Sequence, residues 1–179
     1  MKINRVWSMP NKHTFLIQPI RELIYKYGGD FKNWVDPFAG ENSPADITND
    51  LNDTKPTKHH MKADKFIQSL PSTYPGVLFD PPYSNRQMKE CYEGAGLKYS
   101  FEDSQSLFQY EKKILAPKIQ TGGIGICCGW NSTGFGKGLG FEFIEILLVA
   151  HGGAHHDTIV TVERKFTNPI ILTHTQWQE

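Results

Sequence analysis

The chain has 179 residues, a formal net charge of zero and an apolar fraction of 39%. This length suits one domain with its own hydrophobic core, so residues 1–179 are expected to form a single domain. The zero net charge excludes a protein that holds nucleic acid by bulk electrostatics, because neutralisation of phosphates supplies most non-specific affinity. Binding of nucleic acid would need a local patch, a helper protein or a transient encounter.

Neither the apolar runs nor the cysteines indicate a membrane or an oxidising compartment. The longest apolar runs, such as residues 144–150, are too short to cross a bilayer, and residues 1–7 contain no apolar core of secretory length. The three cysteines, two of them adjacent at Cys127 and Cys128, form neither a disulfide framework nor a zinc pattern. We therefore expect a cytoplasmic chain with reduced, buried thiols and no membrane partner.

The first elements alternate between helix and strand. Residues 19–27 are expected to form a helix, because Pro19 suits a first turn, apolar side chains fall on one face and two glycines follow. Short strands are expected at 33–36, 47–50 and 76–80, and a helix over 63–70 separates the last two.

One connection is unusually short. Only six residues separate Gly40 from Ile47, whereas a parallel crossover normally needs about a dozen. Either the first crossover helix is reduced to a loop, or the second strand is misplaced.

The second half continues the pattern and ends differently. A helix over 104–119, a turn at two glycines and a buried strand over 124–129 are expected. Strands over 141–150 and 158–165 follow, joined by a turn rich in glycine and histidine. The fold class is therefore α/β, with a mainly parallel sheet and a C-terminal antiparallel hairpin.

The sharpest motif is Asp80-Pro81-Pro82-Tyr83, directly after an apolar strand. Ligands of open α/β sheets bind beyond the carboxyl ends of strands, where this corner is expected. Methylation of an aromatic amine requires its nitrogen to become tetrahedral, and two acceptors on its N–H bonds, the Asp80 carboxylate and the Pro81 carbonyl, favour that change. Two prolines stiffen the corner, and Tyr83 offers a face for a flipped base. A simple proline turn closing a strand is the alternative.

Other acidic residues also follow expected strands. Asp36 begins the run Asp36-Pro37-Phe38-Ala39-Gly40, Asp50 closes the next strand, and Asp64 is expected to close a third. S-adenosylmethionine has no pyrophosphate and needs no three-glycine fingerprint. Asp36 would accept from its ammonium group, the Ala39-Gly40 turn would allow close backbone approach, Asp50 would bind the ribose hydroxyls, and Asp64 the adenine amino group. For any one aspartate, a helix cap or a loop charge is the simpler interpretation.

These motifs resemble those of the amino-methyltransferases that act on N6 of adenine in DNA. Residues 36–40 resemble the cofactor motif of that family, and residues 80–83 match its catalytic motif without a change. Residues 13–19, which include Thr14, are similar to the motif that lies against the methionine part of the cofactor. Residues 48–52, 80–92 and 151–157 resemble small, phage-type members. The resemblance covers nearly the whole chain and implies a Rossmann-like methyltransferase fold with a reversed final hairpin.

The chain also departs from the family. The short 40–47 stretch is unlike the general family and lies directly before the strand that Asp50 closes. Relatives that recognise a DNA sequence carry an additional target-recognition region. This chain has only the loops 84–103 and 131–140. Arg86 is a candidate for phosphate binding and Trp130 for lining the base pocket, although a solvated surface and buried packing are the respective alternatives.

The resulting hypothesis is S-adenosylmethionine-dependent methylation of the exocyclic N6 amino group of adenine in DNA. Alternatives are an RNA or cytosine-N4 amino-methyltransferase, or a non-catalytic phage module that binds cofactor or DNA. No metal is expected, because the five histidines of two short clusters have no cysteine or carboxylate at ligand spacing. Those histidines are His59, His60, His151, His155 and His156.

Overall fold

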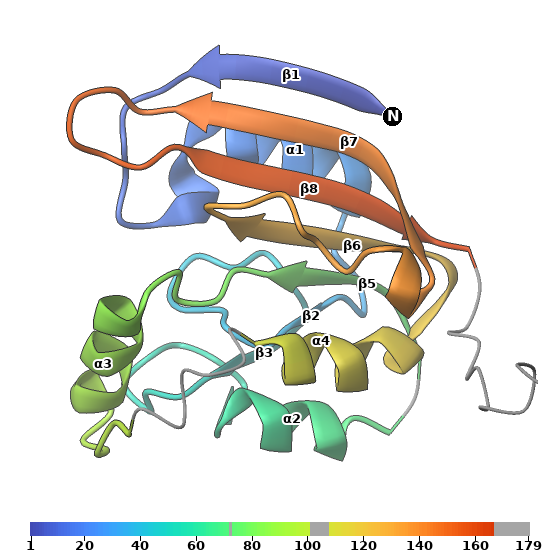
Figure 1. The fold of residues 1–179 in the computed structure, drawn as a ribbon. Helices are drawn as coiled ribbons and strands as arrows, with labels where there is room; N and C mark the ends of the chain where they lie inside the picture. The colour runs from blue at the N-terminus through green and yellow to red at the C-terminus, as the bar shows by residue number, and fades with distance from the viewer. Residues whose placement is uncertain (72, 101–107, 167–179) are drawn as a thin grey trace, which may run out of the picture.

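A computed structural model describes residues 1–71, 73–100 and 108–166 (Figure 1). Its strands are β1 (Lys2–Trp7), β2 (Val35–Asp36), β3 (Ile47–Asp50), β4 (His59–His60), β5 (Tyr74–Phe79), β6 (Ile119–Gly129), β7 (Phe141–Ala150) and β8 (Thr158–Lys165). Its helices are α1 (Gln18–Gly28), α2 (Ala63–Ser69), α3 (Asn85–Gly94) and α4 (Gln109–Leu115), with short 3-10 turns at Thr14–Leu16, Ala116–Lys118 and Lys137–Leu139. None of the described helices combines the length and apolarity needed to span a bilayer.

The eight strands form one sheet in the order β1-β7-β8-β6-β5-β2-β3-β4. Neighbouring strands are parallel except around β8, which runs antiparallel to both β6 and β7. The expected α/β class, with a mainly parallel sheet and a C-terminal hairpin, is therefore confirmed. The hairpin strands β7 and β8 have the predicted bounds.

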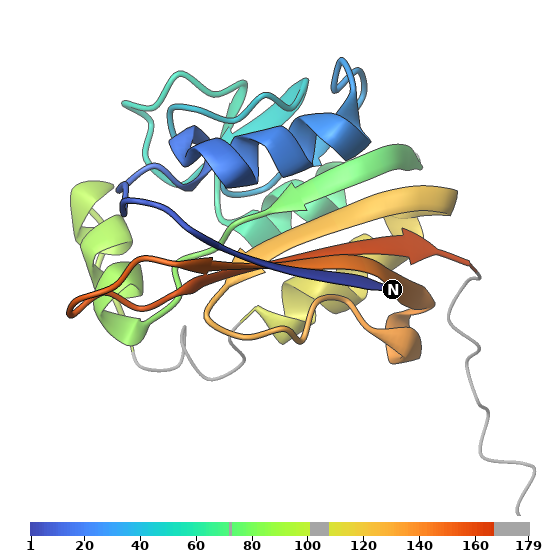
Figure 2. The ribbon, with the colours of Figure 1, turned by 90° about the horizontal axis from the view of Figure 1, so that it is seen from above.

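Helices cover the two faces of the sheet, as Figures 1 and 2 show together. The helix α1 packs on one face, where Ile20 and Ile24 are fully buried against residues of β6, β7 and β8 such as Val162. On the other face, α2 and α4 contribute Phe66 and Leu115 to a second apolar cluster. Burial of both faces explains why the central strands read as apolar runs without alternation.

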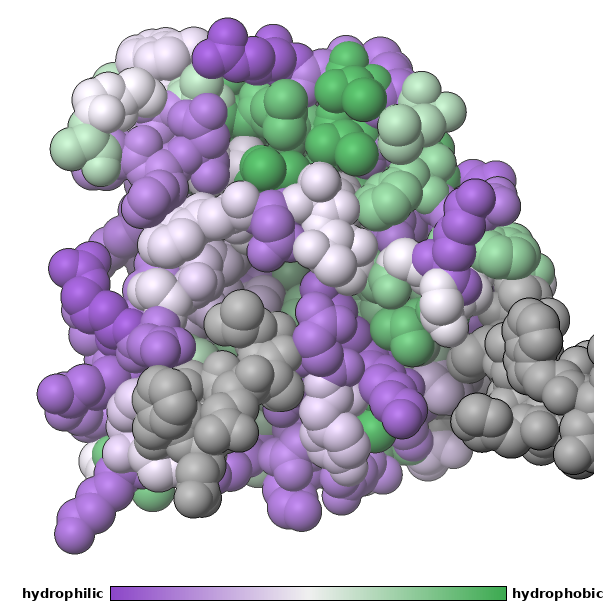
Figure 3. Space-filling view, in the orientation of Figure 1, coloured by the Kyte–Doolittle hydropathy of each residue, from purple (hydrophilic) through white to green (hydrophobic). Residues whose placement is uncertain are grey.

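One part of the sheet keeps an open apolar face. Figure 3 shows a hydrophobic patch over β1 and β7. Ile3 and Trp7 of β1 are exposed, and Ile146, which pairs with Ile3, is half-buried. Among the described residues no helix covers this side of the edge strands.

The short crossover between β2 and β3 is a loop. Residues 37–46 contain no helix, and Ala39 N donates to the Asn49 carbonyl at 2.9 Å. The loop suffices because β2 and β3 pair over only Val35–Asp36 and Ile47–Thr48, so the chain has little distance to return. Of the two interpretations left open by the sequence, the reduced crossover is correct and the second strand is well placed.

Several predicted bounds are wrong. The 33–36 strand starts at Val35 because Asn33 has a φ of 60°. The helix expected over 104–119 ends at Leu115, and residues 101–107 lie outside the described part. The strand β6 starts five residues before the expected 124, and its two glycines lie at a register shift against β5 rather than in a turn before the strand.

Three elements were not predicted at all. The edge strands β1 and β4 were missed, and α3 occupies half of the segment 84–103 that was interpreted as a loop. The helix is capped by Ser84, whose hydroxyl accepts from Gln87 N at 3.3 Å.

Candidate active site

The order of the strands places a switch point between β2 and β5. The chain passes outward from β2 to β3 and β4, and then returns to β5 on the other side of β2. At such a point the connections leaving the carboxyl ends diverge and open a crevice. A cavity of about 830 Å³ lies there, and its walls come from the segments that follow β2, β3, β4 and β5.

Asp80 follows β5 directly and lines this cavity. Burial raises the pKa of its carboxyl group to about 6, while hydrogen bonds from the Tyr83 and Thr14 hydroxyls oppose that rise. The carboxylate therefore stays ionised at neutral pH, and it accepts a hydrogen bond from the Tyr83 hydroxyl. A carboxylate has about four lone-pair positions, so Asp80 can accept further N–H donors from the cavity.

The rest of the corner is held by the start of α3. Pro81, Pro82 and Tyr83 all line the cavity, as predicted from the motif. Tyr83 N donates to the Gln87 side-chain carbonyl at 2.6 Å, which ties the corner to the first turn of α3. Burial raises the pKa of Tyr83 well above 10, so its hydroxyl remains a proton donor toward Asp80. The helix that was missed in the sequence thus fixes the most specific motif.

Asp36 does not line the cavity. It is fully buried, and its two oxygens accept from Phe38 N at 2.9 Å and from the Ser43 hydroxyl at 2.6 Å. Burial, only partly offset by these bonds, raises its pKa to about 7. In this arrangement the carboxylate organises the loop after β2, and the neighbouring Pro37 and Phe38 face the cavity in its place.

The turn at Gly40 is tied to the end of β3. Gly40 has a φ of 56°, a backbone conformation that residues with a Cβ rarely adopt. Its N–H donates to the Asp50 carboxylate at 3.1 Å. A second Asp50 oxygen accepts from Asn52 N at 2.8 Å. A Cβ at Gly40 would meet open space, so the backbone angle is what requires glycine here. Ala39, Gly40 and Asp50 all line the cavity, as predicted.

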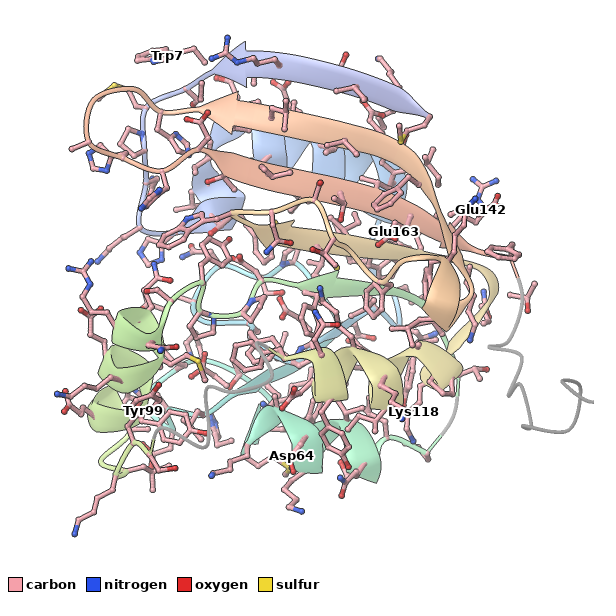
Figure 4. The ribbon with its side chains drawn as sticks, viewed as in Figure 1. Trp7, Asp64, Tyr99, Lys118, Glu142 and Glu163 are labelled. Carbon is pink, nitrogen blue, oxygen red and sulfur yellow. The ribbon has the colours of Figure 1, made fainter. Side chains whose placement is uncertain are left out.

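Asp64 and Thr14 also line the cavity and belong to different elements. Asp64 lies in the first turn of α2, after the unpredicted strand β4 (Figure 4). Thr14 lies before α1, and its hydroxyl is 3.5 Å from that of Tyr83. The structure therefore brings together every predicted site residue of this cavity except Asp36.

The cavity has an apolar wall, of which only Phe38 was predicted from the sequence. Phe38 packs edge-on against Phe108 and Phe79, with ring centroids 4.9 and 5.1 Å apart. Phe108 and Met61 line the cavity beside Phe38. Met61 follows β4, so recognition of that two-residue strand would have identified it; Phe108, at the start of α4 with a φ of 61°, carried no local signal.

A second cavity of about 500 Å³ adjoins the first at Tyr83. Of the three predicted substrate-binding residues, Arg86 and Trp130 line this cavity and not the first, whereas Tyr83 lines both. Trp130 lies edge-on to Tyr83, with ring centroids 5.7 Å apart. No group of three His, Cys, Asp or Glu side chains in the described ranges is arranged to hold a metal ion.

The overall architecture is the Rossmann-like fold of methyltransferases. Neither a protein-family profile nor a curated protein matches the chain. Among solved structures, TrmN from Thermus thermophilus has a TM-score of 0.57 at 12% identity, over 84% of this chain and 49% of that one. The Escherichia coli "Putative methyltransferase yhhF" gives 0.55 at 11%, over 89% and 91%. NSun6 from Pyrococcus horikoshii gives 0.50 at 11%, over 76% and 49%.

The comparisons establish the fold and not the substrate. The chain spans about half the length of TrmN and of NSun6, and nearly the whole of yhhF. Since one fold hosts many activities, the reaction has to be argued from the cavity and its residues.

Proposed function

We propose that this chain is an S-adenosylmethionine-dependent methyltransferase that acts on the exocyclic N6 amino group of adenine in DNA. The observation that carries the proposal is the Asp80–Tyr83 corner, which follows β5 at the switch point and lines the large cavity. The solved structure of yhhF, which has the same fold and is described as a putative methyltransferase, supports the cofactor.

The first cavity suits S-adenosylmethionine in size and chemistry. A volume of about 830 Å³ is in the usual range for a small-molecule site. Asp50 and Asp64 provide acceptors for ribose hydroxyls and an amino group, and Phe38 with Phe108 forms an apolar wall for an aromatic ring. Carboxylates in this cavity also favour a ligand that carries a sulfonium and an ammonium charge.

When bound, S-adenosylmethionine supplies a methyl group on sulfonium, which passes to the attacking nitrogen as the carbon–sulfur bond breaks and its electrons stay on sulfur. The Asp80 carboxylate and the Pro81 carbonyl accept hydrogen bonds from the two N–H groups of the adenine amino group and so favour a tetrahedral nitrogen. Tyr83 holds the base by stacking. Orientation of the amine against the methyl carbon supplies much of the rate. The proton released passes to Asp80 or to water.

The acceptor is assigned to adenine by the aspartate that begins the corner, through the family resemblance described above. A chain of zero net charge fits a weak encounter with DNA, with target choice assisted by a helper protein.

The test is methyl transfer from labelled cofactor to double-stranded DNA, single-stranded DNA and RNA, followed by identification of the methylated nucleoside. We expect N6-methyladenine from DNA. Asp80→Ala should lower the rate at least about 100-fold, the usual cost of a group that stabilises the transition state. Asp53→Asn, in an exposed loop outside both cavities, is the control and should leave the rate unchanged. Full activity of Asp80→Ala, or methylation of another nucleoside, would contradict the proposal.

A further inference from the structure

The two cavities that meet at Tyr83 differ in charge. Six carboxylates line the first cavity, at residues 41, 50, 64, 80, 90 and 111, and they outnumber its three lysines, at residues 12, 55 and 62. No carboxylate of the described residues lines the second, whereas Arg86 and also Lys12, which the two cavities share, place positive charges on its wall. A cavity of this kind favours an anionic ligand, although the chain as a whole is neutral.

An aromatic pair forms another wall of the second cavity. Trp130 follows β6 and packs on His156, with ring centroids 4.2 Å apart and planes tilted by 36°. The Trp130 residue is 38% exposed, so its indole keeps surface available to a ligand. Indole and imidazole rings beside Tyr83 present flat surfaces on which nucleic-acid bases stack without regard to sequence.

The turn between β7 and β8 is anchored by hydrogen bonds, so the aromatic wall is preorganised before a ligand binds. One ring nitrogen of His151 lies 2.9 Å from the Ser8 carbonyl, and the other lies 2.9 Å from the Thr158 hydroxyl. His151 is buried, so these bonds hold the turn against the segment after β1 that carries Lys12. The positive and the aromatic walls are thereby kept in a fixed relation, which lowers the entropic cost of binding.

We propose that the second cavity binds the nucleotide next to the target adenine in a single strand. Lys12 and Arg86 contact its phosphate, and Trp130 with His156 stacks its base. This inference rests on the proposed function, because the target base is taken to enter the first cavity past Tyr83. The site would hold the substrate through residues that adjoin the first cavity.

The experiment measures binding of short labelled oligodeoxynucleotides to the full chain by fluorescence anisotropy, in the presence of S-adenosylhomocysteine. Trp130→Ala should weaken binding about 5- to 150-fold, the range for loss of one stacked base. Arg86→Gln and Lys12→Gln should each reduce the salt dependence, by about 0.7 in the slope of log affinity against log salt per lost phosphate contact.

Lys89→Gln is the matched control for Arg86→Gln. Both residues belong to α3, and both pair with a glutamate four residues later at 3.6 Å, Arg86 with Glu90 and Lys89 with Glu93. Lys89 lines neither cavity, so its replacement should leave the affinity and the salt slope unchanged. Equal effects of the two replacements, or unchanged binding by Trp130→Ala, would overturn the inference.

Measurements of oligonucleotide binding and of methyl transfer distinguish failure of this inference from failure of the proposed function. Asp80→Ala should still bind the oligonucleotide through the second cavity while losing transfer. Oligonucleotide binding that depends on Trp130, in a chain without methyl transfer to any nucleic acid, would support the second cavity and contradict the enzymatic proposal. Methyl transfer by a chain whose oligonucleotide binding is unchanged by replacement of Trp130, Arg86 and Lys12 would support the enzymatic proposal and contradict the second cavity. An oligoribonucleotide of the same sequence tests whether a 2′-hydroxyl is accepted.

Discussion

The hydroxyl of Tyr83 has a role that is separate from the stacking role of its aromatic ring. It donates to the Asp80 carboxylate and helps to hold the pKa of that group down, against burial that raises it to about 6. Asp80 has to be ionised to accept hydrogen bonds from the N–H groups of the substrate amine. Activity should therefore fall as the pH drops through this pKa. A weaker donor at residue 83 would raise the pKa and extend the loss to higher pH.

Tyr83→Phe tests this coupling because it keeps the ring and removes only the donor. We expect the acid limb of kcat/KM against pH to move to higher pH, while activity on the alkaline side of that limb is largely kept. The measurement is kcat/KM over a pH series for the wild type and the variant. An acid limb at the same pH in both would show that the hydroxyl does not tune Asp80. Tyr83→Ala, which also removes the stacking face, should lose activity at every pH.

At the scale of elements, a single carboxylate of β8 positions the glycine-rich segment 131–140. Glu163 accepts from Phe135 N at 2.6 Å and from Gly136 N at 2.7 Å, and Figure 4 shows it on the strand. Phe135 in turn stacks on Phe141 with ring centroids 4.7 Å apart. The Gly134 backbone approaches the same carboxylate so closely that a Cβ there would lie 2.2 Å from an oxygen of Glu163.

Glu163→Gln should therefore destabilise the fold by about 1–3 kcal/mol, because the amide group of glutamine has one oxygen and can replace only one of the two hydrogen bonds from Phe135 N and Gly136 N. The unfolding free energy from urea titration is the measurement, with hydrogen exchange of the Phe135 and Gly136 amides as a local one. Glu142→Gln provides the control, since Glu142 lies exposed on β7. Indistinguishable stabilities of the two variants would refute a role for Glu163 in holding the loop.

The elements that were predicted from sequence are those whose own residues carry a pattern. The hairpin β7–β8 and the strand β3 have their expected bounds, because apolar runs and flanking turn residues mark them. The strand β1 is stabilised by pairing with β7, whose residues lie over 130 positions away, and β4 has only two residues. The helix α3 buries only Met88, so it shows no apolar stripe. Tertiary contacts, not local pattern, decide these three elements.

The candidate site divides in the same way. Residues 80–83, the Ala39-Gly40 turn and Asp50 were placed by the rule that ligands lie beyond the carboxyl ends of strands. The same rule put Asp36 at this edge, but it does not say which way a side chain turns, and Ser43 and Phe38 hold its carboxylate inside the loop. Arg86 and Trp130 of the second cavity were candidates from the sequence, but the cavity as a whole was not predictable, because it joins the turn after β7 to the segment after β1.

At the scale of the whole molecule, a shared wall separates two environments that suit two different ligands. Tyr83 and Thr14 line both cavities, so a cofactor in the acidic cavity and a nucleotide in the basic one would meet at Asp80. The sheet supplies this arrangement because the loops after β2, β3 and β5 and the turn after β7 all lie at its carboxyl edge, on the left in Figure 1. Binding of the cofactor is therefore testable without any turnover.

S-adenosylhomocysteine should raise the melting temperature of the chain, since a ligand that binds only the folded state stabilises it by mass action. At a concentration 100 times its Kd the gain is about 2.7 kcal/mol, which corresponds to a rise of roughly 5–10 °C for a domain of this size. Asp50→Asn should reduce the rise by weakening the contact with the ribose, whereas Asp80→Asn should retain it, because Asp80 serves the acceptor amine. Adenosine alone, which lacks the amino-acid part, should give a smaller rise. A melting temperature that none of these ligands changes would remove the cofactor from the first cavity, and with it the methyl donor on which the proposed reaction depends.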